Sequence, residues 1–390
     1  MKRVNSLLMV PFLLTMVSES IGQKQAIDNG FITVDVTKSY SPKKELILQN
    51  FMDVEYIVLE TNDEFVNQGF VLDIGKDLIL VKNRVDDGDI FIYDRQGKAL
   101  RKINRQGQGS EEYIYITNAI LDEENKEIFV NDHITKNIFV YDLYGKFKRS
   151  FKHKKDPKAY GYLDIFNYNQ DNLICYDKYN EEISFVLISK KDGGITQEIK
   201  IPFKEKKLLM QTNQTSNGTY VVGPGPYRSI IPFKGNWYLL EPSSDAIYQF
   251  FSDYSLRPFI VRTPSVSSME PEIFLSVRLF SDRYYFMETI KNEYDWKEKT
   301  GFPKTFFMYD NHEEAFFRYA VYNGDFSAKK EIYMNAASPV NHEIESWYPL
   351  EAHQLIESYE KGELKGKLKE IAAQLDEEDN RVIMLVKHKK

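Results

Sequence analysis

The chain has 390 residues, of which 42% are hydrophobic and 14% aromatic, and its formal net charge is −7. Aromatic residues at this frequency argue against a disordered chain and suit strands whose faces pack on neighbouring sheets. Positive and negative charges are interspersed, which argues against a nucleic-acid-binding protein with a basic stripe. No polybasic patch for a membrane surface is present either. We therefore expect a folded protein without a nucleic-acid partner.

Residues 1–22 have the pattern of a signal peptide. Lys2 and Arg3 precede an apolar run from Leu7 to Val17, and small or polar residues follow it. The run of about 11 apolar residues is shorter than the roughly 20 that a helix needs to span a bilayer. We expect this segment to direct export and the mature chain, residues 23–390, to contain no transmembrane segment.

The distribution of cysteine bears on how the exported protein is held. No cysteine lies near the predicted cleavage region, so a lipid anchor on a new N-terminal cysteine is not available. Cys175 is the single cysteine; it lies in an apolar stretch and cannot form an internal disulfide. We expect it to be a small buried hydrophobic residue. The predicted location is the periplasm or the cell surface, with the protein soluble rather than lipid-anchored.

A strand followed by a turn recurs along the chain. Residues 90–98 read IFIYDRQGK, and residues 138–146 read IFVYDLYGK, 48 positions later. Looser copies begin at Phe185, Ile247 and Phe306, so the later offsets are 47, 62 and 59 residues. Periods of about 40 to 50 residues that consist of strands predict the blades of a β-propeller. Because a closed array of repeats folds as one unit, we expect a single domain over residues 23–390.

Within one period, four short strands are separated by turns that contain Gly, Asn or Asp, as hairpins require. The strands of the first two periods are predicted at residues 70–74, 78–82, 90–94 and 100–104, and at 119–122, 127–131, 138–142 and 147–151. Three further units are predicted at residues 162–202, 228–264 and 273–322. These assignments give five complete blades.

A sixth blade is predicted to combine strands from both ends of the chain. The strands are Val54 to Leu59 and Val382 to Val386, with contributions from segments around Ile332 and Trp347. A blade shared in this way closes the ring and removes exposed sheet edges. The fold expected from these patterns is an all-β, six-bladed β-propeller.

The stretch from about residue 350 to residue 375 has apolar residues at helical spacing, which predicts a short helical insertion. Gly362 and Gly366 are expected to divide it into two helices. Such helices can bind a partner or pack over the last blade, and packing is the commoner use.

Four stretches of the chain carry a family resemblance. They read VEYIVLET at residues 54–61, GDIFIYD at 88–94, KINRQGQGSEEY at 102–113 and LDEEDN at 375–380. With these motifs the chain resembles the exported six-bladed β-propellers of gut-type Bacteroidetes, which are related to NHL-repeat propellers. The resemblance covers nearly the whole mature chain and implies a fold and an exported location, since most members have no assigned activity.

The chain departs from that family in two respects. The family often has Pro-Gly-Glu where this chain has Ser110, Glu111 and Glu112, a difference that can change the shape of the loop. Many relatives are lipoproteins, whereas this chain lacks the cysteine that such an anchor needs.

The sequence contains none of the common signatures of catalytic or cofactor sites. Residues 107–109 and 223–225 lack the third glycine of a dinucleotide fingerprint, and no Gly-x-Ser-x-Gly elbow or Walker-type loop occurs. The six histidines are scattered, and the acidic turn at residues 86–89 lacks the alternation and distal glutamate of an EF-hand loop. We assign no catalytic residue, metal ligand or cofactor, although a triad can assemble from distant loops.

Loops that enter the innermost strands are expected to line one mouth of the central channel, and they contain unusual side chains. Arginine and tyrosine there could pair with carboxylates and stack on sugars or peptides. The other interpretation is that Arg–Glu pairs tie adjacent blades together. The candidate ligand-binding residues are Arg105, Glu111, Glu112, Tyr113, Tyr160, Tyr227, Arg228 and Arg278.

Two functional classes follow from this sequence. The first is a non-enzymatic binding or assembly module for a glycan, peptide or protein, favoured by the lack of catalytic motifs. The alternative is a hydrolase or lyase in which Glu111 or Glu112 supplies acid or base at the channel mouth. Titratable groups that converge in a pocket would favour the enzyme, and blade-to-blade salt bridges would count against it.

Overall fold

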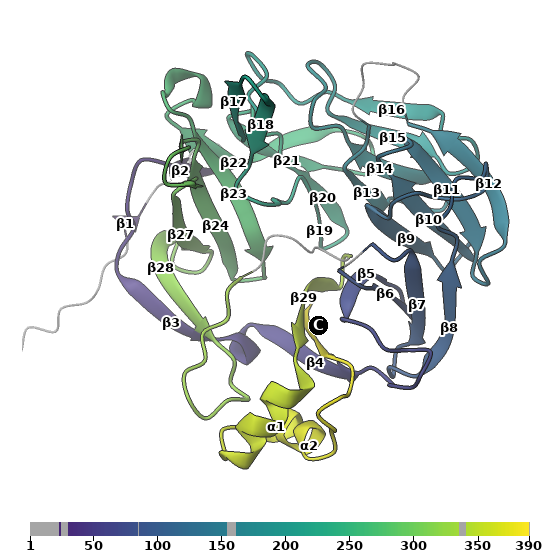
Figure 1. Cartoon of the computed structure of the whole chain (residues 1–390). Coiled ribbons are helices and arrows are strands. Elements are labelled where there is room, and N and C mark those ends of the chain that lie inside the picture. Colours follow the sequence, from purple (N-terminus) through teal and green to yellow (C-terminus); the bar gives the residue numbers. More distant parts are fainter. Residues whose placement is uncertain (1–22, 25–29, 85, 154–160, 335–340, 390) are drawn as a thin grey trace, which may run out of the picture.

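The computed structural model describes residues 23–24, 30–84, 86–153, 161–334 and 341–389. The predicted signal peptide and Tyr160 lie outside these ranges. Figure 1 shows six sheets that stand around a common axis, like the blades of a propeller. The predicted all-β, six-bladed fold is therefore confirmed. No helix within the described ranges is long and apolar enough to cross a membrane.

Blades 1, 2 and 3 are antiparallel sheets of four strands, with the first strand of each nearest the axis. Blade 1 contains β5 (Phe70–Ile74), β6 (Leu78–Lys82), β7 (Asp89–Asp94) and β8 (Ala99–Asn104). Blade 2 contains β9 (Asn118–Asp122), β10 (Glu127–Asp132), β11 (Asn137–Asp142) and β12 (Phe147–Lys152). Blade 3 contains β13 (Asp164–Asn167), β14 (Asn172–Tyr176), β15 (Phe185–Ser189) and β16 (Ile195–Ile199). The strands predicted for the first two blades are correct to within one residue at each end.

The repeated motif builds the third strand of a blade and the turn after it. Asp94 Oδ1 accepts hydrogen bonds from the N–H groups of Gln96 and Lys98, both at 2.9 Å. Asp142 Oδ1 does the same for Tyr144 and Lys146, at 2.8 and 2.9 Å. The glycine within each turn has a positive φ, +84° at residue 97 and +80° at residue 145, which favours glycine. The 48-residue repeat therefore preserves a turn as well as a strand.

Blades 4 and 5 have the same antiparallel order but carry additional outer strands from the N-terminal segment. Blade 4 contains β19 (Ile230–Phe233), β20 (Asn236–Leu239), β21 (Ala246–Phe250), β22 (Leu256–Thr263) and, parallel to β22, β2 (Ile32–Asp35). Blade 5 contains β23 (Ile273–Phe280), β24 (Tyr284–Lys291), β27 (Lys304–Asp310) and β28 (Ala315–Tyr322), with β1 (Gln23–Lys24) and β3 (Lys43–Ile47) along β28. The sequence analysis did not predict these additions, which cover sheet edges that would otherwise be exposed.

The closing blade is a sheet of three strands drawn from both ends of the chain, as predicted. Its order from the axis outward is β29 (Ile344–Leu350), β30 (Val382–His388) and β4 (Met52–Val58). One detail of the prediction was wrong, because the segment around Ile332 does not join this sheet. The N–H of Ile332 donates to the carbonyl of Val321 at 2.7 Å, so the chain turns back along β28 of blade 5 instead.

Two helices, α1 (Ala352–Glu360) and α2 (Gly366–Ala372), connect β29 to β30. Gly362, with φ +69°, follows the end of α1, and Gly366 begins α2, so the predicted division is confirmed. Leu355 and Leu368 are buried in a cluster that includes Val382 of the closing blade. The helices therefore pack on the last blade, the commoner of the two uses considered.

The remaining elements are short. They are the hairpin β17 (Gln211–Thr215) and β18 (Gly218–Val222), the pair β25 (Tyr294–Asp295) and β26 (Thr300–Gly301), and the 3-10 turns η1 (Leu48–Asn50) and η2 (Val266–Ser268).

Each interface between neighbouring blades buries its own hydrophobic cluster. Between blades 1 and 2, for example, Leu80 and Ile92 pack with Ile128 and Val130. Corresponding clusters lie at the other five interfaces, including the one between the closing blade and blade 1. Because every blade is covered on both faces, strands such as β7 are nearly continuous runs of apolar residues.

Candidate functional site

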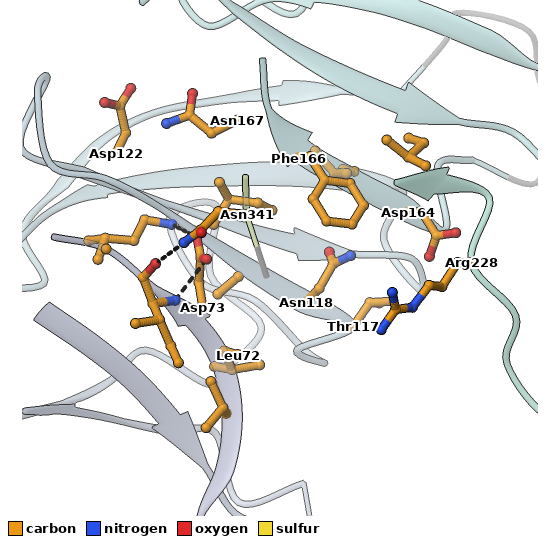
Figure 2. Close-up of a pocket in the computed structure, with 18 of the residues that line it drawn as sticks. Leu72, Asp73, Thr117, Asn118, Asp122, Asp164, Phe166, Asn167, Arg228 and Asn341 are labelled. Carbon is orange, nitrogen blue, oxygen red and sulfur yellow. Dashed lines mark hydrogen bonds between the residues drawn. The ribbon is translucent and has the colours of Figure 1, made fainter. Parts of the chain in front are cut away.

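A cavity of about 560 Å³ lies on the axis of the propeller. Its wall consists of the innermost strands β5, β9 and β13 with the residues that follow β5 and β9, the residues that lead into β19, Trp237 of β20, residues 341 and 342, and Trp347 of β29. Within the described part of the chain, β23 of blade 5 contributes no residue to this wall. The cavity is therefore built mainly by blades 1 to 3 (Figure 2).

Aromatic rings form part of the wall. Phe70 at the start of β5 is 37% exposed and meets Trp347 edge to face, with ring centroids 5.2 Å apart. Phe166 of β13 is half-buried and lies 6.2 Å from Trp237, centroid to centroid. Aromatic faces of this kind can stack on the apolar faces of sugars or on peptide side chains.

Polar side chains around the cavity join successive blades. Four consecutive pairs of blades are linked at their innermost strands, or at residues just before those strands, by side-chain hydrogen bonds. The links are Asn341 Nδ2 to Ile74 O at 2.7 Å (closing blade to blade 1), Leu121 N to Asp73 Oδ2 at 2.7 Å (blades 1 and 2), Asn118 Nδ2 to Leu163 O at 3.2 Å (blades 2 and 3), and Ser229 to Asp164 (blades 3 and 4). We call this set the inter-blade links.

The ion pair of Arg228 and Glu345 adds a link between blade 4 and the closing blade. The guanidinium and the carboxylate form an ion pair whose side chains are 0% and 1% exposed. Arg228 also donates to the backbone carbonyl of Glu345 at 3.0 Å. Glu345 Oε1 accepts the N–H of Phe280 in blade 5 at 3.1 Å, and its other oxygen lies 3.1 Å from Nε2 of His388. The sequence analysis considered Arg–Glu pairs between adjacent blades; this buried salt bridge instead joins two blades that have blade 5 between them.

Two carboxyl groups of the wall have a raised pKa. Burial raises the pKa of Asp73 to about 7, although the N–H groups of Leu121 and Ile74 donate to its oxygens and oppose the shift. Burial also raises the pKa of Asp164, with the hydrogen bond from Ser229 opposing it. Taking the charge of a carboxylate out of water favours its protonated form.

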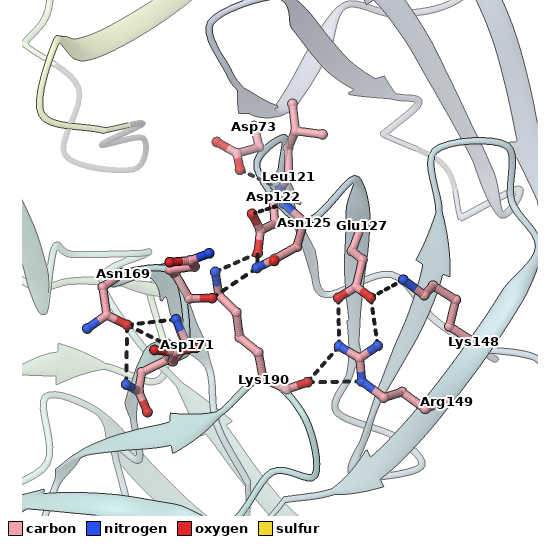
Figure 3. Close-up of polar contacts among 12 residues, drawn as sticks. Asp73, Leu121, Asp122, Asn125, Glu127, Lys148, Arg149, Asn169, Asp171 and Lys190 are labelled. Atoms are coloured by element: carbon pink, nitrogen blue, oxygen red, sulfur yellow. Dashed lines mark hydrogen bonds and ion pairs between the residues drawn. The ribbon is translucent and has the colours of Figure 1, made fainter.

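A second set of contacts, from the end of β9 to the outer strands, ties blades 2 and 3 together (Figure 3). Lys190 Nζ lies 2.5 Å from Asp122 Oδ2, and both side chains are buried. Arg149 binds both oxygens of Glu127, at 2.7 and 2.6 Å, and also donates to the carbonyl of Lys190.

Of the residues predicted to bind a ligand, only Tyr227 and Arg228 line the cavity. Tyr227 is half-buried, and its hydroxyl lies 3.4 Å from that of Tyr176; burial raises its pKa. Arg278 lies in blade 5, where it forms a buried ion pair with Glu288 at 2.6 Å. Tyr160 lies outside the described residues.

The other four predicted residues lie in the loop between β8 and β9 and do not line the cavity. Arg105 Nε donates to the backbone carbonyl of Gly145 at 2.8 Å. The hydroxyl of the buried Tyr113 donates to the backbone carbonyl of Gly88 at 2.7 Å. The carboxylate of Glu112 accepts a hydrogen bond from the N–H of Gly109, and Glu111 is exposed. The loop starts at the outer edge of blade 1 and runs toward the axis. Only its end, at Thr117, therefore reaches the wall.

Sequence reasoning missed Asp73, Asn118, Asp164 and Phe166, which lie on the innermost strands. A usable signal was present, since the first strand of each period contains polar or aromatic residues among apolar ones. Side chains alternate between the two faces of a strand, so these residues can point toward the axis.

The described residues include no group of three His, Cys, Asp or Glu side chains that could hold one metal ion. The wall can therefore offer hydrogen bonds, carboxylates and aromatic faces, spread over several strands.

A protein of known structure shares this architecture. A protein from Bacteroides fragilis NCTC 9343 that is described as exported is 16% identical, and the match covers 92% of this chain and 100% of that one with a TM-score of 0.59. A DUF4221 family member from Bacteroides vulgatus ATCC 8482 is 8% identical, with 87% and 98% covered and a TM-score of 0.47. Identities this low show the fold alone. The comparison with curated proteins found no match. The model of the family DUF5128, described as a 6-bladed beta-propeller, matches residues 22–344, and the chain belongs to this family.

Proposed function

We propose that this protein is an exported binding module that holds a short glycan or peptide in its central cavity. The observation that carries the proposal is the cavity itself. Its volume of about 560 Å³ lies within the range of small-molecule sites, roughly 300–1,000 Å³. Its wall combines accessible aromatic rings with convergent polar groups, the usual composition of a ligand site.

The wall suits recognition of polar ligands with apolar faces. Phe70 and Phe166 present ring surface to the cavity, while Asp164 and Asn118 present oxygen and amide groups from neighbouring strands. Sugars and short peptides have both kinds of surface. The side chains of Asp164 and Asn118 are held by the inter-blade links, so they lose little conformational entropy when a ligand binds.

Binding is favoured over catalysis by the contacts of the polar groups. Both oxygens of Asp73 accept backbone hydrogen bonds, and Arg228 is paired with Glu345. The alternative, in which Glu111 or Glu112 acts as acid or base, gains no support, because neither residue lines the cavity.

Export rests on the sequence pattern of residues 1–22, which lie outside the described structure.

A ligand screen by isothermal titration calorimetry, with oligosaccharides and short peptides, tests the proposal. Leu72 lines the cavity, so Leu72→Trp should obstruct it and weaken binding of any hit at least tenfold. The matched control is Leu100→Trp, since Leu100 lies on the outer strand of the same blade and is 39% exposed. If a hit binds both variants equally well, the cavity is not the site and the proposal fails.

A further inference from the structure

The charges on the cavity wall are unequal. Among the described residues of the wall, five carry carboxylates and a single one, Arg228, is a permanent cation. The acidic residues are Asp73, Asp122, Glu123, Glu124 and Asp164. His342 also lines the cavity, but burial and the neighbouring His388 lower its pKa, which favours its neutral form.

Two cations at or beside the wall are already paired, and a third, Lys178, lies close enough to Asp164 to lower the pKa of that carboxyl. Arg228 forms its ion pair with Glu345, and Lys190 pairs with Asp122 from outside the wall. Glu123 accepts three backbone N–H groups, from Lys76, Asp77 and Leu78, which stabilise its charge without neutralising it. The unpaired negative charge of the wall therefore comes chiefly from Glu123 and Glu124 on the turn after β9, with Asp73 partly ionised near pH 7 because its pKa is about 7.

We propose that the ligand of this cavity carries a protonated amine. This inference rests on the proposed function and specifies its ligand class. A cleft lined by one sign of charge, with walls of low dielectric, concentrates ligands of the opposite sign. The ring of Phe166 adds a negative face on which an organic ammonium group can lie, whereas the ring of Phe70 already has Lys82 Nζ 5.9 Å from its centroid.

An organic cation fits better than a metal ion. The carboxylates are distributed along β5, β9 and β13 and the turn after β9, and the described residues include no group of three that could share one metal ion. An extended ligand with an amine, such as an amino sugar or a lysine-containing peptide, can contact carboxylates on several strands, whereas a single ion cannot.

The pKa values of two wall residues provide a second way to detect a bound cation. Asp73 faces Glu123 and the backbone N–H groups of β5 and β9, and burial raises its pKa to about 7. Asp164 faces Lys178, Ser229 and the tyrosines at 176 and 227, and burial raises its pKa as well. A cation bound beside them would lower both pKa values, and because the pKa of Asp73 is about 7, binding near pH 7 should release protons from Asp73.

The experiment compares two matched pairs of probes by calorimetry with the full mature chain. One pair is the β-1,4-linked disaccharide of glucosamine and its fully N-acetylated form. The other is a dilysine peptide and the same peptide with acetylated amines. We expect the amine form of at least one pair to bind tenfold or more tightly than its acetylated form, which also identifies the source of the amine.

Three results would overturn the inference. Equal or tighter binding of an acetylated form removes the charge preference but leaves the cavity as a ligand site. If an acidic sugar binds and neither amine probe does, the charge preference is likewise wrong and the cavity is still a ligand site. If neither these probes nor the wider screen binds, both the inference and the proposed function fail.

A pair of variants tests where the charge acts. Asp164→Asn keeps an oxygen that can accept from Ser229 but removes a charge from the wall, and it should weaken binding of the amine probe about fivefold or more. Glu378→Gln removes an exposed charge beyond α2 and should leave affinity unchanged. Thermal unfolding of both variants separates lost binding from lost folding. If a folded Asp164→Asn protein binds the amine as wild type does, Asp164 does not contact it and the inference loses its main support.

Discussion

Arg228 and Glu345 join two blades that are not neighbours in the ring. Arg228 precedes the first strand of blade 4, Glu345 lies on the first strand of the closing blade, and blade 5 stands between them. Glu345 also accepts the N–H of Phe280 at the end of β23. One buried carboxylate therefore holds three blades together beside the cavity.

Replacement of Arg228 by methionine should destabilise the fold strongly. The carboxylate of Glu345 would lose its ion-pair partner while it stays buried, which typically costs about 3–5 kcal/mol. Urea unfolding of Arg228→Met measures the loss. The double variant with Glu345→Met should recover part of it, because the buried charge is then gone.

The exposed pair Lys367–Glu370 provides the control for that measurement. Its side chains are 70% and 68% exposed, and Lys367→Met should change the free energy of unfolding by about 1 kcal/mol or less. A similarly small effect of Arg228→Met would mean that the pair across the ring contributes little to stability.

Gly97 should tolerate no side chain because of its contact with the closing blade. An added Cβ would lie 2.0 Å from the carbonyl oxygen of Val58. Gly235 has a similar positive φ, +73° against +84°, but an added Cβ there meets no atom within 4 Å. Gly235→Ala should therefore cost about 1 kcal/mol for its backbone alone. Gly97→Ala should cost about 1–3 kcal/mol more, because the blades must move apart. Equal melting temperatures for the two variants would show that the interface can adjust.

The fold could be predicted from the sequence because the repeat encodes local structure. Asp94 and Asp142 stand at the same place in two blades and make the same turn contacts, so the spacing of 48 residues reflects a physical unit. The outer strands β2 and β3 could not be predicted in this way. They occur once each, and their position depends on which blade edges the N-terminal segment passes.

The residues of the cavity were harder to predict from the sequence than the fold. Arg105 and Tyr113 lie in a loop that does enter an innermost strand, as expected, but the loop spans the whole depth of the blade. Its first residues stay near the outer edge and contact Gly145 and Gly88. Residues of the wall, such as Asp73 and Asp164, come from different blades, and only the closed ring brings them together.

The repeat also provides a pair of arginines whose contacts differ in one respect. Arg149 and Arg101 each donate to a carbonyl of the next blade, of Lys190 and Leu143 respectively. Of the two, Arg149 also binds a carboxylate, that of Glu127 within blade 2. Burial alone would raise the pKa of Glu127, but hydrogen bonds from Arg149 and Lys148 outweigh it and hold the pKa below its ordinary value.

Arg149→Ala should therefore cost about 2 kcal/mol at neutral pH, and less in acid. A carboxylate with a lowered pKa stabilises the fold above its unfolded pKa, about 4.3, and this stabilisation is lost as the pH falls through the lower folded value. Urea unfolding at pH 7 and pH 3 measures the difference. Arg101→Ala is the control and should show a pH-independent loss. A loss for Arg149→Ala that is equal at both pH values would contradict the role of Glu127.

Asp73 should make the protein less stable as the pH rises from about 4 to about 7. Its pKa is about 7 in the folded protein, chiefly because of burial, against about 3.9 in an unfolded chain. Between these values the folded state binds more protons than the unfolded state, so the free energy of unfolding falls with increasing pH and is level above about 7. Asp73→Asn cannot titrate, and its stability should vary less across this range. Urea unfolding at intervals from pH 4 to pH 8 measures both curves, with Glu378→Gln as a variant that should follow the wild type. Parallel curves for wild type and Asp73→Asn would show that Asp73 is ionised throughout and that its backbone hydrogen bonds outweigh its burial.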